Sequence, residues 1–323
     1  MLRRLLAAAM VAAAAVLPLP VMAQSDWPTQ PIHWIVPFPA GGQAEVATRI
    51  VAEHLSSMWG QPVLVEAKPG ANGNLGSEDV ARSNPDGYTW LSSGVPLSTA
   101  PAMYASTINY DPVNDLVPVV KIGSTTFVMV VPKAVPVSTL DEFIAYAKQN
   151  DLAYAGSGIG SLVHLGSEMF KLKAGIDMQM IPYNGQPPAV TDVLANRVQF
   201  MIMGLALSEP LIKSGDIKAL AVLDAQRHPH LPDVPTIGEA GYPDMVMNGW
   251  AGIHLPKDTP EAIVKKISDG VNEVLKSTDF QEQMRKAGWN PEPPNTPEEF
   301  KAFFEKEVQS WQQTVTDAKV QTN

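Results

Sequence analysis

Two glycine-rich segments, each placed between a strand-like run and a helix-like run, are the parts of this sequence best suited to hold an anion. The first runs Pro39-Ala40-Gly41-Gly42-Gln43-Ala44-Glu45, and the second runs Ala155-Gly156-Ser157-Gly158-Ile159-Gly160-Ser161-Leu162-Val163-His164. Glycine lets the backbone approach a ligand closely, and the first amides of a helix have no backbone partner. Such amides bind anions. We therefore expect the amides of Gly42, Gln43 and Ala44 to face a bound anion; a tight turn without a ligand is the alternative.

The second segment adds side-chain donors and an imidazole to its glycines. Ser157 and Ser161 supply hydroxyl groups, and His164 falls in the first turn of the predicted helix. His164 and Glu168 are also spaced as two metal ligands on one helix face, but no third ligand candidate stands nearby. We favour a histidine that is hydrogen-bonded to the neighbouring loop.

Three patterns for nucleotide binding or catalysis are not met. The second segment has Val163 where a dinucleotide fingerprint needs glycine, and no Gly-Lys-Ser/Thr follows any glycine run. The nucleophile elbow Gly-x-Ser-x-Gly does not occur, because Leu91 and Ala155 stand two places before Ser93 and Ser157. A catalytic carboxylate pair stays open, since 33 acidic residues make chance pairs abundant.

Two other sets of ionisable residues are better explained by a structural role than by ligand binding. Glu45 lies in the first turn of a predicted helix, four residues before Arg49, which is typical of a residue that caps the helix and forms an ion pair. The pair His228 and His230 flanks a proline in a proline-rich loop, which favours solvated side chains.

Strand-like runs alternate with helix-like runs along the chain, and this order predicts parallel sheets. The predicted strands are residues 33–38, 63–66, 88–92, 127–131, 152–155, 199–203 and 219–223. The predicted helices are residues 43–58, 141–149, 161–172, 188–194 and 260–275, followed only by helix-like sequence. The extended runs 119–131 and 248–255 are expected to cross between two lobes, with hinges near 123–126 and 248–251.

The N-terminus has the three parts of a secretory signal peptide. Arg3 and Arg4 precede an apolar run over residues 5–21, and Ala23 is a small residue suited to cleavage. We expect the mature chain to begin at Gln24. A membrane anchor is the alternative, but Pro18 and Pro20 interrupt the run, which is shorter than the roughly 20 residues of a bilayer span.

Composition narrows the class of protein. The mature chain would have about 300 residues, and 45% of the whole sequence is apolar. This is enough for two domains with ordinary hydrophobic cores. No cysteine is present, so disulfides and thiolate metal sites are excluded. The formal charge of −10 argues against nucleic acid as a partner. Net charge cannot attract an anion here, so its recognition must depend on local dipoles.

The sequence resembles the Bug-type substrate-binding proteins of tripartite tricarboxylate transporters over essentially the whole mature chain. The motifs that carry the resemblance are Trp27-Pro28, Pro31-Ile32, Ile35-Val36-Pro37-Phe38-Pro39-Ala40-Gly41-Gly42, Gly60-Gln61-Pro62-Val63, Lys68-Pro69-Gly70-Ala71-Asn72-Gly73, Asn84-Pro85-Asp86-Gly87-Tyr88-Thr89, Tyr110-Asp111-Pro112, His164-Leu165, Pro182-Tyr183-Asn184-Gly185, Leu231-Pro232-Asp233-Val234-Pro235-Thr236 and Glu239-Ala240-Gly241.

The resemblance implies an α/β fold, a two-lobed periplasmic binding protein of the "Venus flytrap" type, in which each lobe is a central β-sheet flanked by helices. We expect residues 24–124 with 248–323 to form one lobe, and residues 125–247 the other. The implied protein is monomeric, is not an enzyme, has no cofactor or metal, and delivers a small carboxylate to the permease subunits of a membrane transporter.

The resemblance also implies that one ligand carboxylate sits between the two glycine segments. The expected contacts are Phe38, Gly41, Gly42, Gln43 and Ala44 in one lobe, and Ser157, Gly160, Ser161 and His164 in the other. Strand ends that we expect to complete the pocket supply Asn74, Ser92, Ser93, Tyr183, Asn184, Met203 and Gly204. Tyr183 is equally well explained as a core or rim aromatic residue.

Departures from the family pattern suggest the class of ligand. Glu45 replaces the usual aspartate, Ala40 replaces a common second proline, and the expected far wall, residues 201–207, is wholly apolar. We therefore expect an acid with an apolar or aromatic body, such as a terephthalate-like mono- or dicarboxylate, ahead of a tricarboxylate or an amino acid. A periplasmic sensor that contacts a signalling protein is one alternative function, and an enzyme of unknown type is another.

Overall fold

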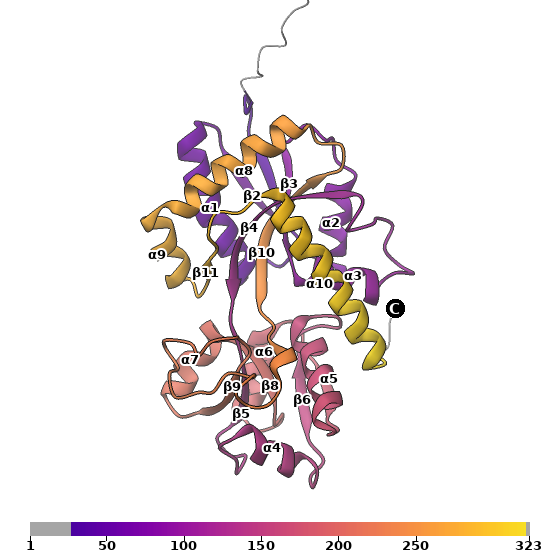
Figure 1. Cartoon of the computed structure of the whole chain (residues 1–323), viewed down its shortest axis with the longest axis vertical. Helices are drawn as coiled ribbons and strands as arrows, with labels where there is room; N and C mark the ends of the chain where they lie inside the picture. The colour runs from indigo at the N-terminus through magenta and orange to yellow at the C-terminus, as the bar shows by residue number, and fades with distance from the viewer. Residues whose placement is uncertain (1–26, 321–323) are drawn as a thin grey trace, which may run out of the picture.

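The described part of the chain, residues 27–320 of this computed structural model, divides between two lobes that stand one above the other (Figure 1). The predicted signal peptide, residues 1–23, and its cleavage site after Ala23 lie outside the described residues. Within residues 27–320, no helix is both long enough and apolar enough to cross a membrane.

The first lobe is built on a six-stranded mixed sheet with the strand order β11-β4-β10-β3-β1-β2. Strand β1 is parallel to β2 and β3, whereas β10 is antiparallel to β3 and β4. Four of the five β1 side chains are buried, because helices cover both faces of the sheet. The strands are β1 (Ile32–Val36), β2 (Val63–Ala67), β3 (Thr89–Gly94), β4 (Leu116–Thr125), β10 (Gly249–Pro256) and β11 (Asn290–Pro291).

Helices of the first lobe come from both ends of the chain. One core cluster joins α1, α8 and α9 to the sheet through residues such as Trp34 and Trp90, whose rings meet edge-on at 5.2 Å. Helices α3 and α10 pack on each other and α10 also packs on β4. The helices are α1 (Gln43–Trp59), η1 (Ala71–Gly73), α2 (Asn74–Ala81), α3 (Val95–Met103), α8 (Glu261–Lys276), α9 (Thr278–Lys286) and α10 (Pro297–Asp317).

The second lobe has two small sheets. Strand β5 (Phe127–Pro132) lies between β8 (Met201–Gly204) and β9 (Ile217–Val222), antiparallel to both, and β6 (Ala153–Gly156) is parallel to β7 (Gln179–Pro182). Three stacked rings, Phe143, Phe170 and Phe200, hold its core together. The flanking helices are α4 (Leu140–Ala147), α5 (Leu162–Ala174), α6 (Gln186–Leu194), α7 (Leu205–Lys213) and η2 (Pro243–Met245).

Two extended segments connect the lobes, as the sequence predicts. Strand β4 belongs to the first sheet and β5 to the second, with Thr126 between them, and β10 returns the chain to the first sheet. The prediction of parallel sheets is confirmed for β1 with β2 and β3, and for β6 with β7, but it is wrong for β4, β5, β8, β9, β10 and β11. For β4 and β10 the reason is that one strand takes the chain out of the first lobe and the other brings it back, so the two run in opposite directions.

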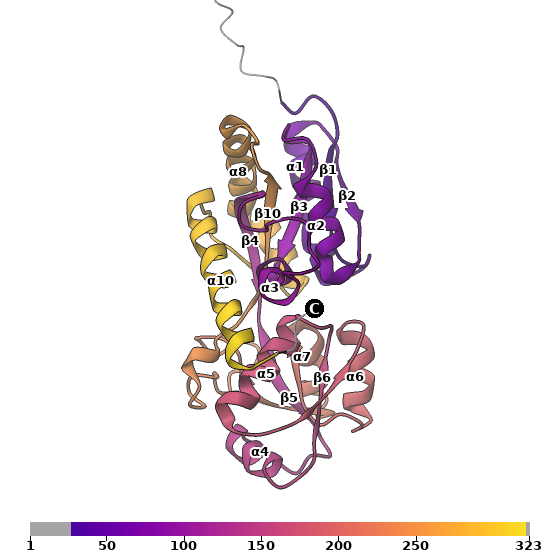
Figure 2. The same cartoon turned by 90° about the vertical axis from the view of Figure 1, so that its right-hand side faces the viewer.

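Helix α10 extends from the first lobe toward the second (Figures 1 and 2). A capping box of Thr296 and Glu299 begins the helix. The Glu307 carboxylate accepts hydrogen bonds at 3.2 Å from the indole N–H groups of Trp250, on β10, and Trp311. Burial raises the pKa of Glu307. Near its end, Thr314 reaches helix α5 of the second lobe, with its hydroxyl 3.6 Å from the sulfur of Met169.

Candidate functional site

The first glycine segment follows β1 and leads into α1, as predicted. Gly41 has a φ of +78°, which glycine adopts without the strain that a side chain would introduce. The Gly41 amide donates to Glu45 Oε2 at 2.5 Å, and Arg49 Nε donates to Glu45 Oε1 at 2.9 Å. These bonds lower the pKa of Glu45. The interpretation of Glu45 as a capping and ion-pairing residue is confirmed, because its carboxylate is bound by the Gly41 amide just before α1 and by Arg49 on α1.

The second glycine segment is ordered by the helix that follows it. The Ser161 hydroxyl caps α5 by accepting from the His164 amide at 3.2 Å, and it accepts a further bond from Ser157 Oγ at 3.3 Å. In return, His164 Nδ1 accepts a hydrogen bond from the Gly160 amide at 3.0 Å. Burial lowers the pKa of His164, so the neutral imidazole that accepts this bond is favoured.

The metal-like spacing of His164 and Glu168 does not produce a metal site. Glu168 Oε1 accepts hydrogen bonds from the Tyr154 hydroxyl at 2.5 Å and from Lys171 at 3.1 Å. No group of three or more histidine, cysteine or acidic side chains in residues 27–320 is arranged to hold a metal ion. The hydrogen-bonding role expected for His164 is confirmed by its bond to Gly160.

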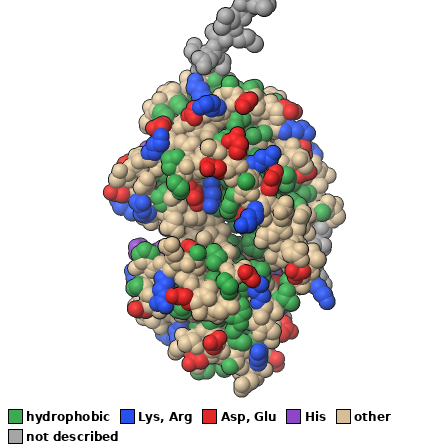
Figure 3. Space-filling model, viewed as in Figure 1, with side chains coloured by type: hydrophobic (Ala, Val, Ile, Leu, Met, Phe, Trp, Pro, Cys, Tyr) green, Lys and Arg blue, Asp and Glu red, His purple; other side chains and the backbone are tan. Residues whose placement is uncertain are grey.

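Contacts from the first lobe also hold the second glycine segment. Thr99 Oγ1 on α3 donates to the Gly160 carbonyl at 3.0 Å, and the Tyr104 hydroxyl donates to the Ile159 carbonyl at 2.9 Å. A Cβ atom added to Gly160 would lie only 3.2 Å from Met103 Cγ. The two lobes therefore meet at this segment. Figure 3 shows the indentation between the lobes on one face of the molecule.

Thr99 and Tyr104 are not predicted from the sequence. Helix α3 contains Pro96 and Pro101 and is apolar on most sides, so it has no helical periodicity to detect. The partners of Tyr104, just after α3, and of Thr99, on α3, lie 55 and 61 residues away in the sequence. No local pattern in one sequence reveals such a contact.

Two predicted serines, Ser92 and Ser93, lie near the end of β3. Ser92 Oγ bonds Thr48 Oγ1 at 2.9 Å, and Ser93 Oγ bonds Nδ1 of the fully buried His254 at 2.7 Å. Burial lowers the pKa of His254 to about 3, so this imidazole is neutral near pH 7. A small cavity of about 10 Å³ brings together four predicted residues, Phe38, Asn74, Ser92 and Ser93, with others that include Asn72.

The remaining predicted residues lie in several environments in the second lobe. The Tyr183 hydroxyl donates to Asp192 at 2.7 Å. Burial, together with this bond, raises the pKa of Tyr183 to about 12. Asn184 is exposed. Met203 is fully buried in the core. Gly204 is the N-cap of α7, and its amide donates to Gln186 Oε1 at 2.8 Å. The apolar strand part of residues 201–207 thus belongs to the core.

A separate cavity of about 460 Å³ lies on the flank of the crossing, between α7 and the loop after β9 on one side and α9 with β11 on the other. Its polar lining includes Arg285, Glu209 and the pair His228 and His230, of which His230 Nδ1 lies 3.0 Å from Glu209 Oε2. Trp289 also lines it and donates to the Gln43 carbonyl at 3.2 Å. The cavity shares no residue with the predicted site.

Comparison with known proteins gives a consistent result. A family model described as "Tripartite tricarboxylate transporter family receptor" matches residues 47–319. The "Protein BugT" of Bordetella pertussis is 38% identical over 296 residues, which cover 90% of each chain.

Solved structures are similar over nearly the same extent. The periplasmic binding protein BugD has a TM-score of 0.81 at 33% identity, and "R. palustris Rpa4515 with adipate" has 0.83 at 32%; each match covers 92% of this chain and 100% of the other. MatC from Rhodopseudomonas palustris, "with bound malate", has a TM-score of 0.80 at 27% identity and covers 90% of this chain and all of that chain.

Proposed function

We propose that this chain, which belongs to the tripartite tricarboxylate transporter receptor family, captures one small carboxylate between its lobes and presents it to the membrane subunits of a transporter. Members of this family are periplasmic solute-binding receptors, and the fold is that of such receptors. For this chain we propose export through a signal peptide cleaved after Ala23, action as a monomer, and lobe boundaries at 124/125 and 247/248.

The observation that carries the proposal is the position of the second glycine segment. Its backbone is held both by His164 in its own lobe and by Thr99 and Tyr104 in the other lobe. A ligand bound to this segment would therefore be sensed by both lobes at once. Binding energy gained only in the closed arrangement shifts the open-to-closed equilibrium toward it.

We assign the carboxylate to the two helix N-termini that follow the glycine segments. The first turns of α1 and α5 supply outward-facing amides, with hydroxyl donors from Ser157 and Ser161. The Gly41 amide already donates to Glu45, so we assign the first-lobe contact to the amides of Gln43 and Ala44. None of the predicted contact residues carries a formal charge near pH 7 if histidine is neutral.

The same features support an acid with an apolar body, such as a terephthalate-like mono- or dicarboxylate. A tricarboxylate would bring further charges to a set of residues with no lysine or arginine. An amino acid would need a counter-charge for its ammonium group, and the Glu45 carboxylate is already paired with Arg49. Adipate, named with a 32% identical structure, has an unbranched hydrocarbon body between its carboxylates. Malate, named with a 27% identical one, is a more polar dicarboxylate.

A thermal-shift screen of the purified mature protein against mono-, di- and tricarboxylates tests this function. A ligand present at a hundredfold its Kd stabilises the folded state by about 2.7 kcal/mol, which shifts the melting temperature by several degrees. We expect benzoate-, terephthalate- or adipate-like acids to stabilise the protein and to be recovered unchanged. Tight binding of citrate or aspartate without binding of these acids would overturn the substrate class, and chemical turnover of a bound acid would overturn the receptor function.

A further inference from the structure

The turn before α2 holds its backbone in an unusual conformation. Ala71 and Asn72 both have left-handed backbones, with φ values of +47° and +53°. Asparagine tolerates this conformation better than most residues, whereas alanine rarely adopts it. Such positions persist only where the surrounding structure enforces them, and they are often found at ligand sites. The turn therefore fixes the Asn72 side chain at a cost in conformational energy.

The Asn72 side chain also lacks a hydrogen-bond partner. Its Nδ2 atom is buried and donates to no group in residues 27–320. Buried donors in native proteins are nearly always paired, so each exception needs an explanation. A ligand that supplies an acceptor is one explanation, and the position of Asn72 supports it.

Asn72 stands between the two lobes. It lines the small cavity that contains Phe38, Ser92 and Ser93. It also faces the second glycine segment, since a Cβ atom added to Gly160 would lie 3.5 Å from Asn72 Nδ2 and one added to Gly158 would lie 4.0 Å from Asn72 Oδ1. The amide is thus placed where groups from both lobes meet.

Asn74, two residues later, lines the same small cavity but differs in its hydrogen bonds and its backbone conformation. Its Nδ2 donates to the Ala71 carbonyl at 2.8 Å, and its Oδ1 accepts from the Tyr110 hydroxyl at 2.9 Å. Its backbone is helical, with φ −63°. Asn74 is therefore fully engaged in holding the turn that presents Asn72.

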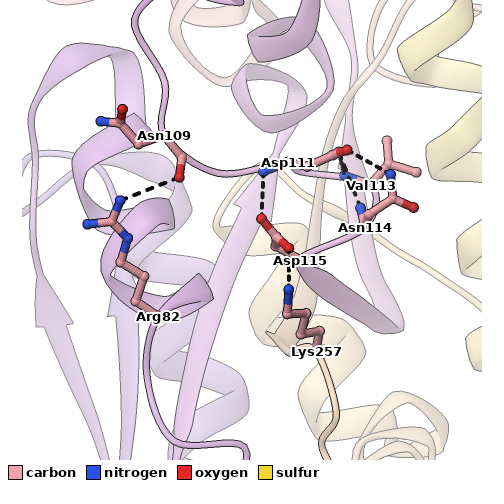
Figure 4. Close-up of polar contacts among 7 residues, drawn as sticks. All are labelled: Arg82, Asn109, Asp111, Val113, Asn114, Asp115 and Lys257. Carbon is pink, nitrogen blue, oxygen red and sulfur yellow. Dashed lines mark hydrogen bonds and ion pairs between the residues drawn. The ribbon is translucent and has the colours of Figure 1, made fainter.

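The loop that carries Tyr110 is itself fixed, as Figure 4 shows. Asp111 accepts bonds from the Val113 and Asn114 amides, and Asp115 accepts from the Asp111 amide at 2.9 Å and from Lys257 at 2.8 Å. The bond to Lys257, which follows β10, lowers the pKa of Asp115. The support beneath Asn74 thus extends to the strand that crosses between the lobes.

We propose that Asn72, and not Asn74, is the asparagine that recognises the ligand, with its Nδ2 donating to an oxygen of the bound carboxylate when the lobes are closed. This inference rests on the proposed function and adds a specificity-determining residue to it. Asn72 would require an acceptor at this position, so it selects a carboxylate oxygen and disfavours an ammonium group there.

Three variants test the assignment, and Asn74→Ala supplies the comparison for stability. Asn72→Asp replaces the donor with a negative charge, so we expect the Kd for the best-bound acid of the panel, with adipate and benzoate as first probes, to rise about a hundredfold or more. Asn72→Gly removes the donor, and glycine adopts the same left-handed backbone conformation without strain. We therefore expect about tenfold weaker binding without a lower melting temperature. Asn74→Ala should lower the melting temperature by several degrees, and because Asn74 holds the turn that presents Asn72, any loss of affinity in this variant should accompany that loss of stability.

Calorimetric titration and thermal melting of the same samples separate the outcomes. The inference is overturned if Asn72→Asp binds as tightly as the wild type, or if Asn72→Gly melts below the wild type while its affinity is unchanged. If the wild type binds no acid of the panel, the proposed substrate class fails. The melting temperatures of the ligand-free variants then still decide which asparagine holds the turn.

Discussion

The two glycine segments share a sequence pattern but are held in different ways. The first is fixed inside its own lobe, because Glu45 and Arg49 on α1 secure the Gly41 amide. The second is fixed from both lobes, by His164 on one side and by Thr99 and Tyr104 on the other. The first segment can therefore keep its shape whatever the position of the lobes, whereas the second completes its contacts only when the lobes meet.

This difference in how the two glycine segments are held suggests a separate role for each of them. A segment fixed within one lobe can dock a ligand first, and a segment completed by both lobes can report that closure has occurred. Variants that disturb closure should therefore act through the second segment, and variants that alter local charge should act through the first. Four substitutions test this division.

Gly160→Ala should have the largest effect. The new Cβ would approach Met103 Cγ to 3.2 Å at a φ of +76°, so it should hinder contact between the lobes. We expect ligand affinity to fall at least about tenfold, which corresponds to about 1.4 kcal/mol. Gly41→Ala, with a φ of +78° but no atom within 4 Å of the new Cβ, has the backbone strain without the interlobe contact. Equal losses of affinity in the two variants would remove the distinction between the segments.

Tyr104→Phe should have the next largest effect. It deletes one hydrogen bond between the lobes, worth about 0.5–1.5 kcal/mol, so we expect a two- to tenfold rise in Kd as measured by calorimetry. Scattering in solution should show a more open ligand-free protein. Tyr146→Phe, on α4 in the second lobe, is the control. Unchanged affinity and shape in Tyr104→Phe would show that this bond does not contribute to closure.

The pH dependence of the second segment should be smaller and should depend on His164. Burial lowers the pKa of His164 below its ordinary 6.5, so the unfolded chain takes up its proton first as the pH falls. The stability contributed by the neutral imidazole is full above pH 6.5 and is lost as the pH falls through the folded-state pKa. His164→Asn keeps an acceptor for Gly160 without a titrating group. We expect the melting temperature of this variant to fall less on acidification than that of the wild type, with a difference in the free energy of unfolding of about 1 kcal/mol at most. An equal fall in the two proteins would contradict this role.

Glu45→Gln should have the smallest effect. The change removes a negative charge beside the proposed carboxylate site, and Arg49 is about half exposed, at 54%. We expect binding of a monocarboxylate to tighten by less than about threefold, with little change in stability. Titration at low and high salt should show the gain shrinking as salt screens the charges. A large loss of affinity would instead mean that Glu45 contacts the ligand directly.

Elements with their own local signals could be predicted from sequence. Helix α1 was expected at residues 43–58 and spans Gln43–Trp59, because its apolar spacing is regular and glycines stand at both ends. Both crossings were found for a similar reason, since long extended runs are uncommon in an otherwise alternating chain. Both glycine segments precede helices, as predicted.

The parts that were missed depend on distant partners. Asn72 belongs to an Asn-Gly pair, which indicates a turn, but only the folded chain shows that its amide is buried beside Gly160. Met203 is expected in the pocket wall because it lies at a strand end, yet its apolar side chain also suits the core, where it is fully buried. Composition alone could not separate a core strand from an exposed wall.

Strand β10 has a consequence for the order in which the molecule can fold. It pairs with β3 and β4, and its His254 meets Ser93, a residue 161 positions earlier. The strands of the second lobe all fall within one uninterrupted stretch, residues 127–222. Contacts between distant residues form slowly, since a long loop must close first. As the chain emerges from its N-terminus to its C-terminus, all strands of the second lobe are present before β10 can pair with the free edge of β3. We therefore expect the second lobe to be completed before the first lobe.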